Sequence, residues 1–411
     1  MNGKSLLIIG KVWPEPNSSA AGSRMMQLID LFLNHGWEIT YASAAGNREF
    51  SEDLSKKKID AVGIRINDSS FDAFASNLNP DMVIFDRFMT EEQFGWRVAE
   101  QCPEAVRILD TEDIHCLRIA RHQAFKEKRG FIESDLFTEH AKREIASIYR
   151  CDLSLIISNY EYTLLDQVFR VNDELLHYIP FMLEPINGAI RDSWIPFEER
   201  KNFISIGNFL HEPNWDAVLN LKEIIWPRIK AELPQAELNI YGAYPSQKVF
   251  QLNNQAEGFL IKGRVEDAKE VMSRARVCLA PLRFGAGLKG KLIEAMQCGT
   301  PSVTSTIGAE AMYGNLNWAG EIVDDPGDFV DKSIKLYNDP SLWKNSQENG
   351  IQIINLIYPK KELGEILIEK INNIRSNLNL HRHKNFTGAM LMHHTLASTR
   401  YMSKWIEEKN K

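Results

Sequence analysis

Cysteine pairs, long apolar runs and an excess of positive charge are all missing from this chain of 411 residues. The five cysteines are scattered and none forms a Cys-x-x-Cys pair, which argues against a disulfide framework or a zinc site and favours a cytoplasmic location. No stretch approaches the roughly 20 apolar residues that span a bilayer. We therefore expect a soluble protein that at most associates peripherally with a membrane. The formal net charge of -7 provides no global positive field, so nucleic acid is not an expected partner.

A dinucleotide-binding fingerprint is missing as well. The loop at residues 10–22 is rich in small residues but lacks Gly-x-Gly-x-x-Gly. Those glycines let a backbone approach a pyrophosphate closely, so their absence argues against a dinucleotide-dependent oxidoreductase.

The chain does contain a regular alternation of strands and helices. Residues 5–9 and 39–42 are apolar and are typical of buried strands, and residues 25–33 carry apolar side chains at helical spacing. This order predicts a β-α-β unit in a parallel sheet, because strands buried on both faces are apolar throughout. Similar units continue to about residue 180.

The alternation breaks once and then restarts. Residues 184–201 lose their periodicity and contain two prolines and a glycine, and a new strand begins near residue 203. We therefore predict an α/β protein with two Rossmann-like domains, residues 1–190 and 191–387. A ligand cleft is expected where the carboxyl ends of the two sheets face each other. The charged residues 126–145 are expected to form one exposed helix.

The strongest chemical signal lies in residues 280–311. A strand ends there in a glycine-rich loop, Lys289 and Lys291 stand where the next helix begins, and Glu294 follows one turn later. Small residues and a helix N-terminus suit a phosphate, lysines add point charges, and a carboxylate accepts hydrogen bonds from ribose hydroxyls. This order fits a nucleoside diphosphate. A solvated lysine pair at an ordinary loop–helix junction fits the same spacing.

The run from Glu294 to Val303, EAMQCGTPSV, resembles the donor-binding half of the group 1, or family 4, retaining glycosyltransferases of GT-B fold. The resemblance extends over residues 203–312 and, more weakly, to the start of the chain. That family carries a Glu-x7-Glu signature whose second glutamate matches Glu294. Its first glutamate falls on Ala286, so the signature is incomplete. The identity of the sugar is therefore open, and more weight falls on the backbone around Ala286.

The resemblance implies a glycosyltransferase that moves a hexose from a nucleoside diphosphate sugar to a hydroxyl of a carbohydrate or glycoconjugate acceptor, with retention. Polysaccharide or glycoconjugate synthesis is the context it implies. The chain has no Asp-x-Asp, so we expect no metal and no cofactor. Lysines and a helix dipole would then stabilise the leaving diphosphate. The resemblance also implies that a last helix, about residues 388–411, crosses back onto the N-terminal domain.

The candidate site residues form three groups. The donor-binding group follows the strand near residue 203 and the glycine-rich loop, and comprises Asn208, His211, Arg283, Gly287, Leu288, Lys289, Lys291 and Glu294. The loop after the first strand would face a phosphate or the acceptor, through Ser18, Ser19, Gly22 and Arg24. The loop after the strand at 106–110 would orient sugar hydroxyls through Asp113 and His115. These two residues and Lys291 are the candidate catalytic residues.

Each group also has a purely structural interpretation. His211 can flank a helix N-cap without touching a ligand. The first loop can equally be a well-capped turn, and residues 110–115 can open a helix through a capping box. Two other functions stay open. A GT-B-like nucleotide-sugar epimerase would need an acid and a base on one sugar carbon, which the sequence does not identify. A catalytically inactive nucleotide-sugar-binding subunit is compatible with Ala286.

Overall fold

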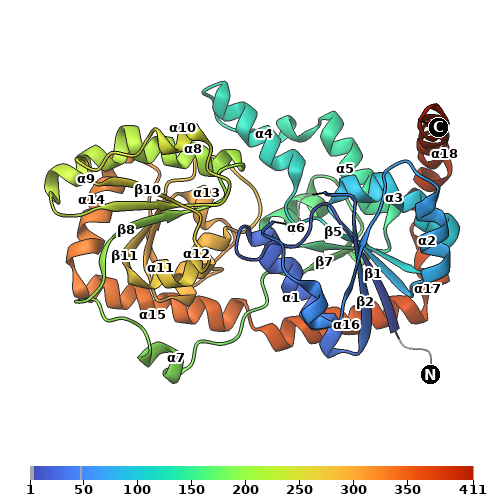
Figure 1. The fold of residues 1–411 in the computed structure, drawn as a ribbon, viewed down its shortest axis with the longest axis horizontal. Helices are drawn as coiled ribbons and strands as arrows, with labels where there is room; N and C mark the ends of the chain where they lie inside the picture. Colours follow the sequence, from blue (N-terminus) through green and yellow to red (C-terminus); the bar gives the residue numbers. More distant parts are fainter. Residues whose placement is uncertain (1–3, 47–48, 411) are drawn as a thin grey trace.

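The computed structural model describes residues 4–46 and 49–410, except for the side chains of residues 394–397. Residue 411 of the predicted last helix therefore lies outside the described residues. Two parallel sheets, each covered by helices, lie side by side in Figure 1. The predicted α/β class with two Rossmann-like domains is confirmed.

The N-terminal sheet has seven strands within the described residues. Their order across the sheet is β3 (Asp60–Gly63), β2 (Trp37–Ser43), β1 (Lys4–Gly10), β4 (Met82–Asp86), β5 (Val106–Asp110), β6 (Leu153–Ile156) and β7 (Leu176–Tyr178). The helices and turns between them are α1 (Ala20–Asn34), η1 (Leu54–Lys57), α2 (Ser70–Leu78), α3 (Phe88–Gln101), α4 (His115–Lys126), η2 (Glu133–Leu136), α5 (Glu139–Arg150), α6 (Asn159–Gln167) and η3 (Asp173–Leu175).

Strand β1 shows why this sheet needs helices on both faces. Leu6 and Ile8 belong to the hydrophobic cluster beneath α1, whereas Leu7 and Ile9 belong to the cluster on the opposite face, with Phe94 of α3. Successive side chains of a strand point to opposite faces, so a strand that is apolar at every position is stable only between two layers. Because β1 is central, the loops at its carboxyl end open into the middle of the molecule.

The C-terminal sheet has six strands within the described residues. Their order is β10 (Phe259–Gly263), β9 (Leu238–Tyr241), β8 (Lys201–Ile206), β11 (Ala275–Ala280), β12 (Ser302–Thr304) and β13 (Gly320–Ile322). The helices around it are α8 (Glu212–Asn220), the π-helical turn η4 (Leu221–Ile225), α9 (Trp226–Glu232), α10 (Gln247–Phe250), α11 (Ala268–Arg274), α12 (Gly290–Gln297), α13 (Thr306–Ala309), α14 (Pro326–Asn338) and α15 (Pro340–Ile357).

Two chain segments cross between the domains. The first contains the short helix α7 (Gly188–Asp192), within the region where the sequence loses periodicity. The second follows α15 at Tyr358, and the two are joined because Leu183 donates its N–H to the Tyr358 carbonyl at 2.8 Å and accepts from the Lys360 N–H at 3.0 Å. Figure 1 shows α15 beside the C-terminal sheet and α16 (Lys360–Ser376) continuing under the N-terminal one.

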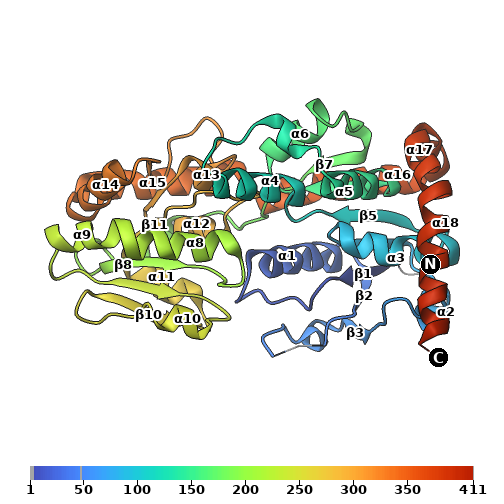
Figure 2. The same ribbon diagram turned by 90° about the horizontal axis from the view of Figure 1, so that it is seen from above.

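The return to the N-terminal domain comes earlier than the sequence predicts. Leu367 and Ile371 of α16 are buried in the same cluster as Leu28 of α1. The predicted boundary at residue 387 is therefore wrong for residues 360–387. Helices α17 (Leu378–Lys384) and α18 (Phe386–Lys409) follow, and α18 packs across α3 and α5 at the end of the molecule in Figure 2. No helix of the described chain combines the length and the apolar composition that a bilayer crossing needs.

The sequence predicts one helix over the charged residues 126–145, and this prediction is wrong. Helix α4 ends at Lys126, and Lys128 has a φ of 54°, which breaks the helical path. Helix α5 then starts afresh, with the Thr138 hydroxyl accepting from the Ala141 N–H. Charge alone carries no stop signal, whereas this left-handed residue and this N-cap do.

Candidate active site

A cleft of about 1150 Å³ separates the two domains. Its N-terminal wall comes from the β1–α1 loop and from the ends of β4 and β5. Its C-terminal wall comes from the β8–α8 and β11–α12 loops, with the ends of β9 and β10. The carboxyl ends of both parallel sheets thus line one cavity, which is where open α/β sheets bind ligands.

Lys291 lies in the C-terminal wall and is held by a short chain of hydrogen bonds. Its Nζ donates to Asn214 Oδ1 at 2.8 Å, and Asn214 Nδ2 donates to the Asn208 carbonyl at 2.9 Å. A Cβ at Gly207 would lie 2.8 Å from Lys291 Nζ, so glycine makes room for the ammonium. Burial lowers the pKa of Lys291 to about 8. No carboxylate neutralises this ammonium within 4 Å among the described residues.

Lys289 stands at the N-cap position of α12, one residue before the helix begins. It is 8% exposed, and its Nζ donates to the Gly287 carbonyl at 2.7 Å. Burial lowers its pKa to about 8. No side chain in the described part of the chain caps α12. The N–H groups of Leu292 and Ile293 donate to the Lys289 carbonyl, whereas those of Gly290 and Lys291 have no partner among the described residues and are left for water or a ligand. Two desolvated ammonium groups therefore stand beside an uncapped helix N-terminus.

Glu294 lies one turn into α12 and lines the same cleft. Burial raises its pKa to about 7, although the charges of Lys269 and Lys291 act in the opposite direction. Asn208, His211, Gly287 and Leu288 also line the cleft. The structure thus brings seven of the eight predicted donor residues to one surface.

Gly287 and Arg283 are engaged differently from the prediction. The Gly287 N–H donates to Glu161 Oε1 of α6 at 2.8 Å, so this backbone group binds the other domain. Arg283 points away from the cleft and forms a bidentate pair with Asp216 of α8 at 2.6 and 2.8 Å. The assignment of Arg283 to the donor site is therefore wrong. Its carboxylate partner is 67 positions earlier in the chain, a contact that the motif spacing does not reveal.

The β1–α1 loop reaches the cleft through its serines. Ser18 is 8% exposed, and its hydroxyl has no hydrogen-bond partner within the described chain. The Ser19 hydroxyl caps α1 by accepting from the Gly22 N–H at 3.0 Å. Gly22 itself does not line the cleft, because it packs against the backbone of Glu15, which a Cβ would approach to 2.4 Å. The prediction that Gly22 faces a ligand is wrong, and its role is to close this turn.

The sequence suggests that Arg24 meets an anion in the cleft, and this prediction is wrong. Its guanidinium is buried, pairs with Asp110 Oδ1 at 2.9 Å and donates to the Ile179 carbonyl at 2.5 Å. It therefore joins α1 to β5 and to the segment after β7. A charged residue at a helix start predicts an anion site only if its side chain points outward, and this one points into the sheet.

Asp113 and His115 lie together at the end of β5, on the N-terminal wall. His115 Nε2 is 3.4 Å from Asp113 Oδ1, and Asp113 also accepts from Arg118. Burial acts to raise the pKa of Asp113, but Arg118 and His115 outweigh it and hold the value at about 2. Burial lowers the pKa of His115 to about 3. At neutral pH this pair is a carboxylate beside an uncharged imidazole.

Comparison with known proteins now bears on the C-terminal wall. Residues 200–339 match the family model of the group 1 glycosyl transferases. No curated protein matches the chain.

Solved structures resemble the whole chain. Sucrose-phosphate synthase from Thermosynechococcus elongatus is 15% identical, with 91% of this chain and 99% of that chain covered at a TM-score of 0.66. The pneumococcal O-GlcNAc transferase GtfA, solved with UDP and GlcNAc, is 12% identical, with 91% and 99% covered at 0.67. HepE from Anabaena, solved with UDP-glucose, is 10% identical, with 90% and 99% covered at 0.66. At these identities the likeness shows the fold alone, and the predicted GT-B architecture is confirmed.

The glycosyl transferase match contains the lysines, Glu294 and the β8–α8 loop, but it does not reach the N-terminal wall. The sequence argument also missed several residues of that wall and of the domain contact: Lys11, Arg87, Arg118, Arg121 and Glu161. They come from the ends of different strands and from helices far apart in the chain. No local spacing identifies such a set, and only the strand order of the sheet brings them together.

Proposed function

We propose that this protein is a glycosyltransferase that moves a hexose from a nucleoside diphosphate sugar to an acceptor hydroxyl with retention. The observation that carries the proposal is the pair Lys289 and Lys291 at the uncapped start of α12, inside the interdomain cleft. The group 1 glycosyl transferase match over residues 200–339 supports the same assignment. Solved proteins of similar fold hold UDP with GlcNAc, or UDP-glucose, which makes a UDP-sugar the first donor to test.

The proposed chemistry places the diphosphate at α12. The bond between the anomeric carbon and the diphosphate oxygen breaks, and its electron pair leaves with the diphosphate. Both ammonium groups and the N–H groups of the first helical turn stabilise that developing charge. We assign this role to them rather than to a metal or a cofactor. Glu294 then lies one turn further along, where it can accept hydrogen bonds from the ribose hydroxyls.

The acceptor enters on the opposite wall in this proposal. Its oxygen bonds to the anomeric carbon on the face that the diphosphate leaves, and its proton passes to a departing phosphate oxygen. Asp113, ionised because of Arg118 and His115, orients a sugar hydroxyl by accepting its hydrogen bond. Neutral His115 donates or accepts beside it. Synthesis of a polysaccharide or glycoconjugate in the cytoplasm, with peripheral membrane association, is the setting that we propose.

The first experiment is a thermal-shift screen of UDP-, GDP- and ADP-sugars, because a ligand that binds the folded state raises the melting temperature. The donor so identified is then used in a transfer assay with Lys291→Ala. Loss of one positioned donor to a developing oxyanion costs about 100-fold or more in kcat, and we expect a loss of that size. EDTA leaves the wild-type rate unchanged.

Lys361→Ala is the matched control, since Lys361 is 86% exposed on α16 and far from the cleft. It should keep the wild-type rate. Both variants should unfold within about 1 kcal/mol of the wild type, as surface and cleft lysines usually do. Full transfer activity in Lys291→Ala would refute the phosphate assignment. Exchange of sugars without an acceptor would instead identify a nucleotide-sugar epimerase.

A further inference from the structure

Three cations stand on the N-terminal wall of the cleft, opposite the lysines of α12: Lys11, Arg87 and Arg118. Lys11 follows β1, Arg87 follows β4 and Arg118 lies in the first turn of α4, after β5. Strands β1, β4 and β5 are neighbours in the sheet, so three residues far apart in sequence meet at one edge. The proposed diphosphate site uses none of them.

Lys11 forms no ion pair through its ammonium within the described residues, although its backbone N–H donates to Asp86 Oδ2 at 3.0 Å. Its side chain is exposed in the cleft, and its Nζ contacts the Met89 sulfur at 3.2 Å, with no carboxylate within 4 Å among the described residues. Desolvation at the cleft wall and the nearby charges of Arg87 and Arg118 lower the pKa of Lys11, and the charge of Asp86 acts in the opposite direction. A thioether is a weak acceptor, so this ammonium lacks a strong partner.

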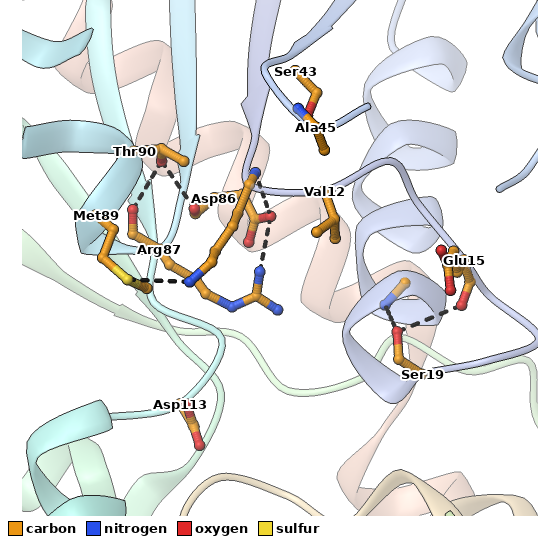
Figure 3. A network of polar contacts seen from close by, with 12 residues as sticks. Val12, Glu15, Ser19, Ser43, Ala45, Asp86, Arg87, Met89, Thr90 and Asp113 are labelled. Carbon is orange, nitrogen blue, oxygen red and sulfur yellow. Dashed lines mark hydrogen bonds and ion pairs between the residues drawn. The ribbon is translucent and has the colours of Figure 1, made fainter. Parts of the chain in front are cut away.

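Arg87 is held at the cleft at a cost to its backbone. It has φ 70° and ψ 155°, a region that residues other than glycine rarely occupy. Among the described residues its side chain donates to one partner, from Nη1 to Asp86 Oδ2 at 3.1 Å, which leaves most of the five guanidinium donors for a ligand. Figure 3 shows Arg87 and Asp86 at the end of β4, with Glu15 and Ser19 further along the same wall, around the start of α1. Residues held in such conformations cluster at active sites and ligand-binding sites.

Four carboxyl groups lie near these cations: Asp86, Asp110, Glu112 and Asp113. Burial raises the pKa of Asp86, and burial together with the charge of Asp110 raises the pKa of Glu112 to about 8. Asp110 is already paired with Arg24. Asp113 is the fully ionised partner, with a pKa of about 2, and Arg118 binds it. Lys11, Arg87 and Arg118 therefore face one fully ionised carboxylate, Asp113, together with Asp86 and Glu112, whose burial favours the protonated form.

We propose that Lys11, Arg87 and Arg118 form an anion-binding subsite for the acceptor, which carries a phosphate or a carboxylate group. This proposal rests on the glycosyltransferase function above. The two arginines offer planar pairs of N–H donors that match either group, and Lys11 adds a mobile charge. Asp113 and His115 lie beside the subsite, so the anionic group would hold the acceptor with its hydroxyl toward the donor sugar.

The test uses full-length protein saturated with UDP, so that the proposed diphosphate site is already occupied. Binding of four probes is measured by calorimetry: glucose 6-phosphate, glucuronate, methyl glucoside and inorganic phosphate. We expect at least one of the anionic probes to bind about tenfold more tightly than methyl glucoside, and the preference to shrink as salt is added. A preference for glucose 6-phosphate over glucuronate identifies a phosphate group, and the reverse identifies a carboxylate.

Lys11→Met separates this subsite from the donor site. We expect it to weaken anionic probes about tenfold, while UDP binds as in the wild type. Lys361→Met removes the same charge from exposed α16 and should change neither anion binding nor UDP binding.

Equal binding of charged and neutral probes, no binding of any probe, or unchanged anion binding in Lys11→Met would each overturn the proposal. If Lys11→Met weakened UDP instead, the three cations would belong to the donor site and the glycosyltransferase assignment would stand. Failure of the wild type to bind any nucleotide would refute that assignment itself.

Discussion

Arg87 holds a backbone conformation that suits glycine, at the point where β4 ends and α3 begins. Replacement by glycine and replacement by alanine both remove the guanidinium, but only glycine adopts φ 70° without strain. We therefore expect Arg87→Gly to be more stable than Arg87→Ala by about 1–3 kcal/mol. The free energies of unfolding of the two variants in urea measure this difference directly.

Arg143 provides the matched control pair, because it is half-exposed in the middle of helix α5. There the order of stability reverses, and alanine exceeds glycine by about 1 kcal/mol. If alanine were the more stable replacement at both positions, Arg87 would not be strained. The strained backbone of Arg87 would then no longer support a functional role for its side chain.

At the scale of elements, the start of α12 makes nucleotide binding depend on pH. Lys289 and Lys291 have pKa values of about 8 without a ligand, because both are buried. A bound diphosphate favours the charged form and raises both values. Affinity for UDP should therefore change little below pH 7 and fall about twofold for each lysine between pH 7 and 8, where the free ammonium groups begin to lose their protons. Above pH 8 it should fall by up to about tenfold per pH unit for each lysine that must take up a proton.

Calorimetry in buffers of different ionisation enthalpy measures this proton uptake. Above pH 8 we expect up to two protons to be taken up per UDP bound by the wild type, and about one fewer by Lys291→Met. Affinity independent of pH up to 9 would mean that these ammonium groups do not contact the phosphates.

The same element shows what a sequence can predict and where it stops. Lys289, Lys291 and Glu294 lie within six positions on one loop and helix, so local spacing alone places them on a common surface. Arg24 and Arg283 look equally suitable in the sequence, but each has a carboxylate partner that turns its side chain away from the cleft. Side-chain direction depends on partners far along the chain, which a motif does not contain.

At the scale of the whole molecule, the two predicted domains and their cleft are present, but the path of the chain between them was only partly predictable. Pro359 separates α15 from α16 at the crossing, but a proline that ends one helix does not indicate which domain the next helix joins. What assigns α16 to the N-terminal domain is its partner surface on α1, through residues such as Leu367 and Leu28. The apolar face of a helix indicates that the helix is packed against a partner, but it does not identify which sheet that partner is.

The domains are also held together across the cleft by helix α4. Arg121 of α4 forms a bidentate ion pair with Glu310 of the C-terminal domain, at 2.7 and 2.8 Å, and donates to the Gly285 carbonyl at 2.9 Å. Beside it, the ring of His122 stacks on Phe284 with centroids 4.3 Å apart. These contacts lie next to the loop that precedes α12, so closure of the domains and the geometry of the proposed donor site are linked.

Removal of one partner of such a buried pair costs about 3–5 kcal/mol, because the other charge stays desolvated. Arg121→Gln should therefore favour an open arrangement of the domains, in which Glu310 regains water. Small-angle X-ray scattering should show a larger radius of gyration than in the wild type, and a nucleotide that bridges both walls should partly reverse the change. The KM for the donor should rise, since part of the binding energy is used to close the cleft.

Arg129→Gln is the control, because Arg129 pairs with Asp135 inside the N-terminal domain and should leave scattering and KM unchanged. If Arg121→Gln scattered like the wild type, the closed arrangement would depend on the apolar contacts and on the Glu161–Gly287 hydrogen bond rather than on this ion pair.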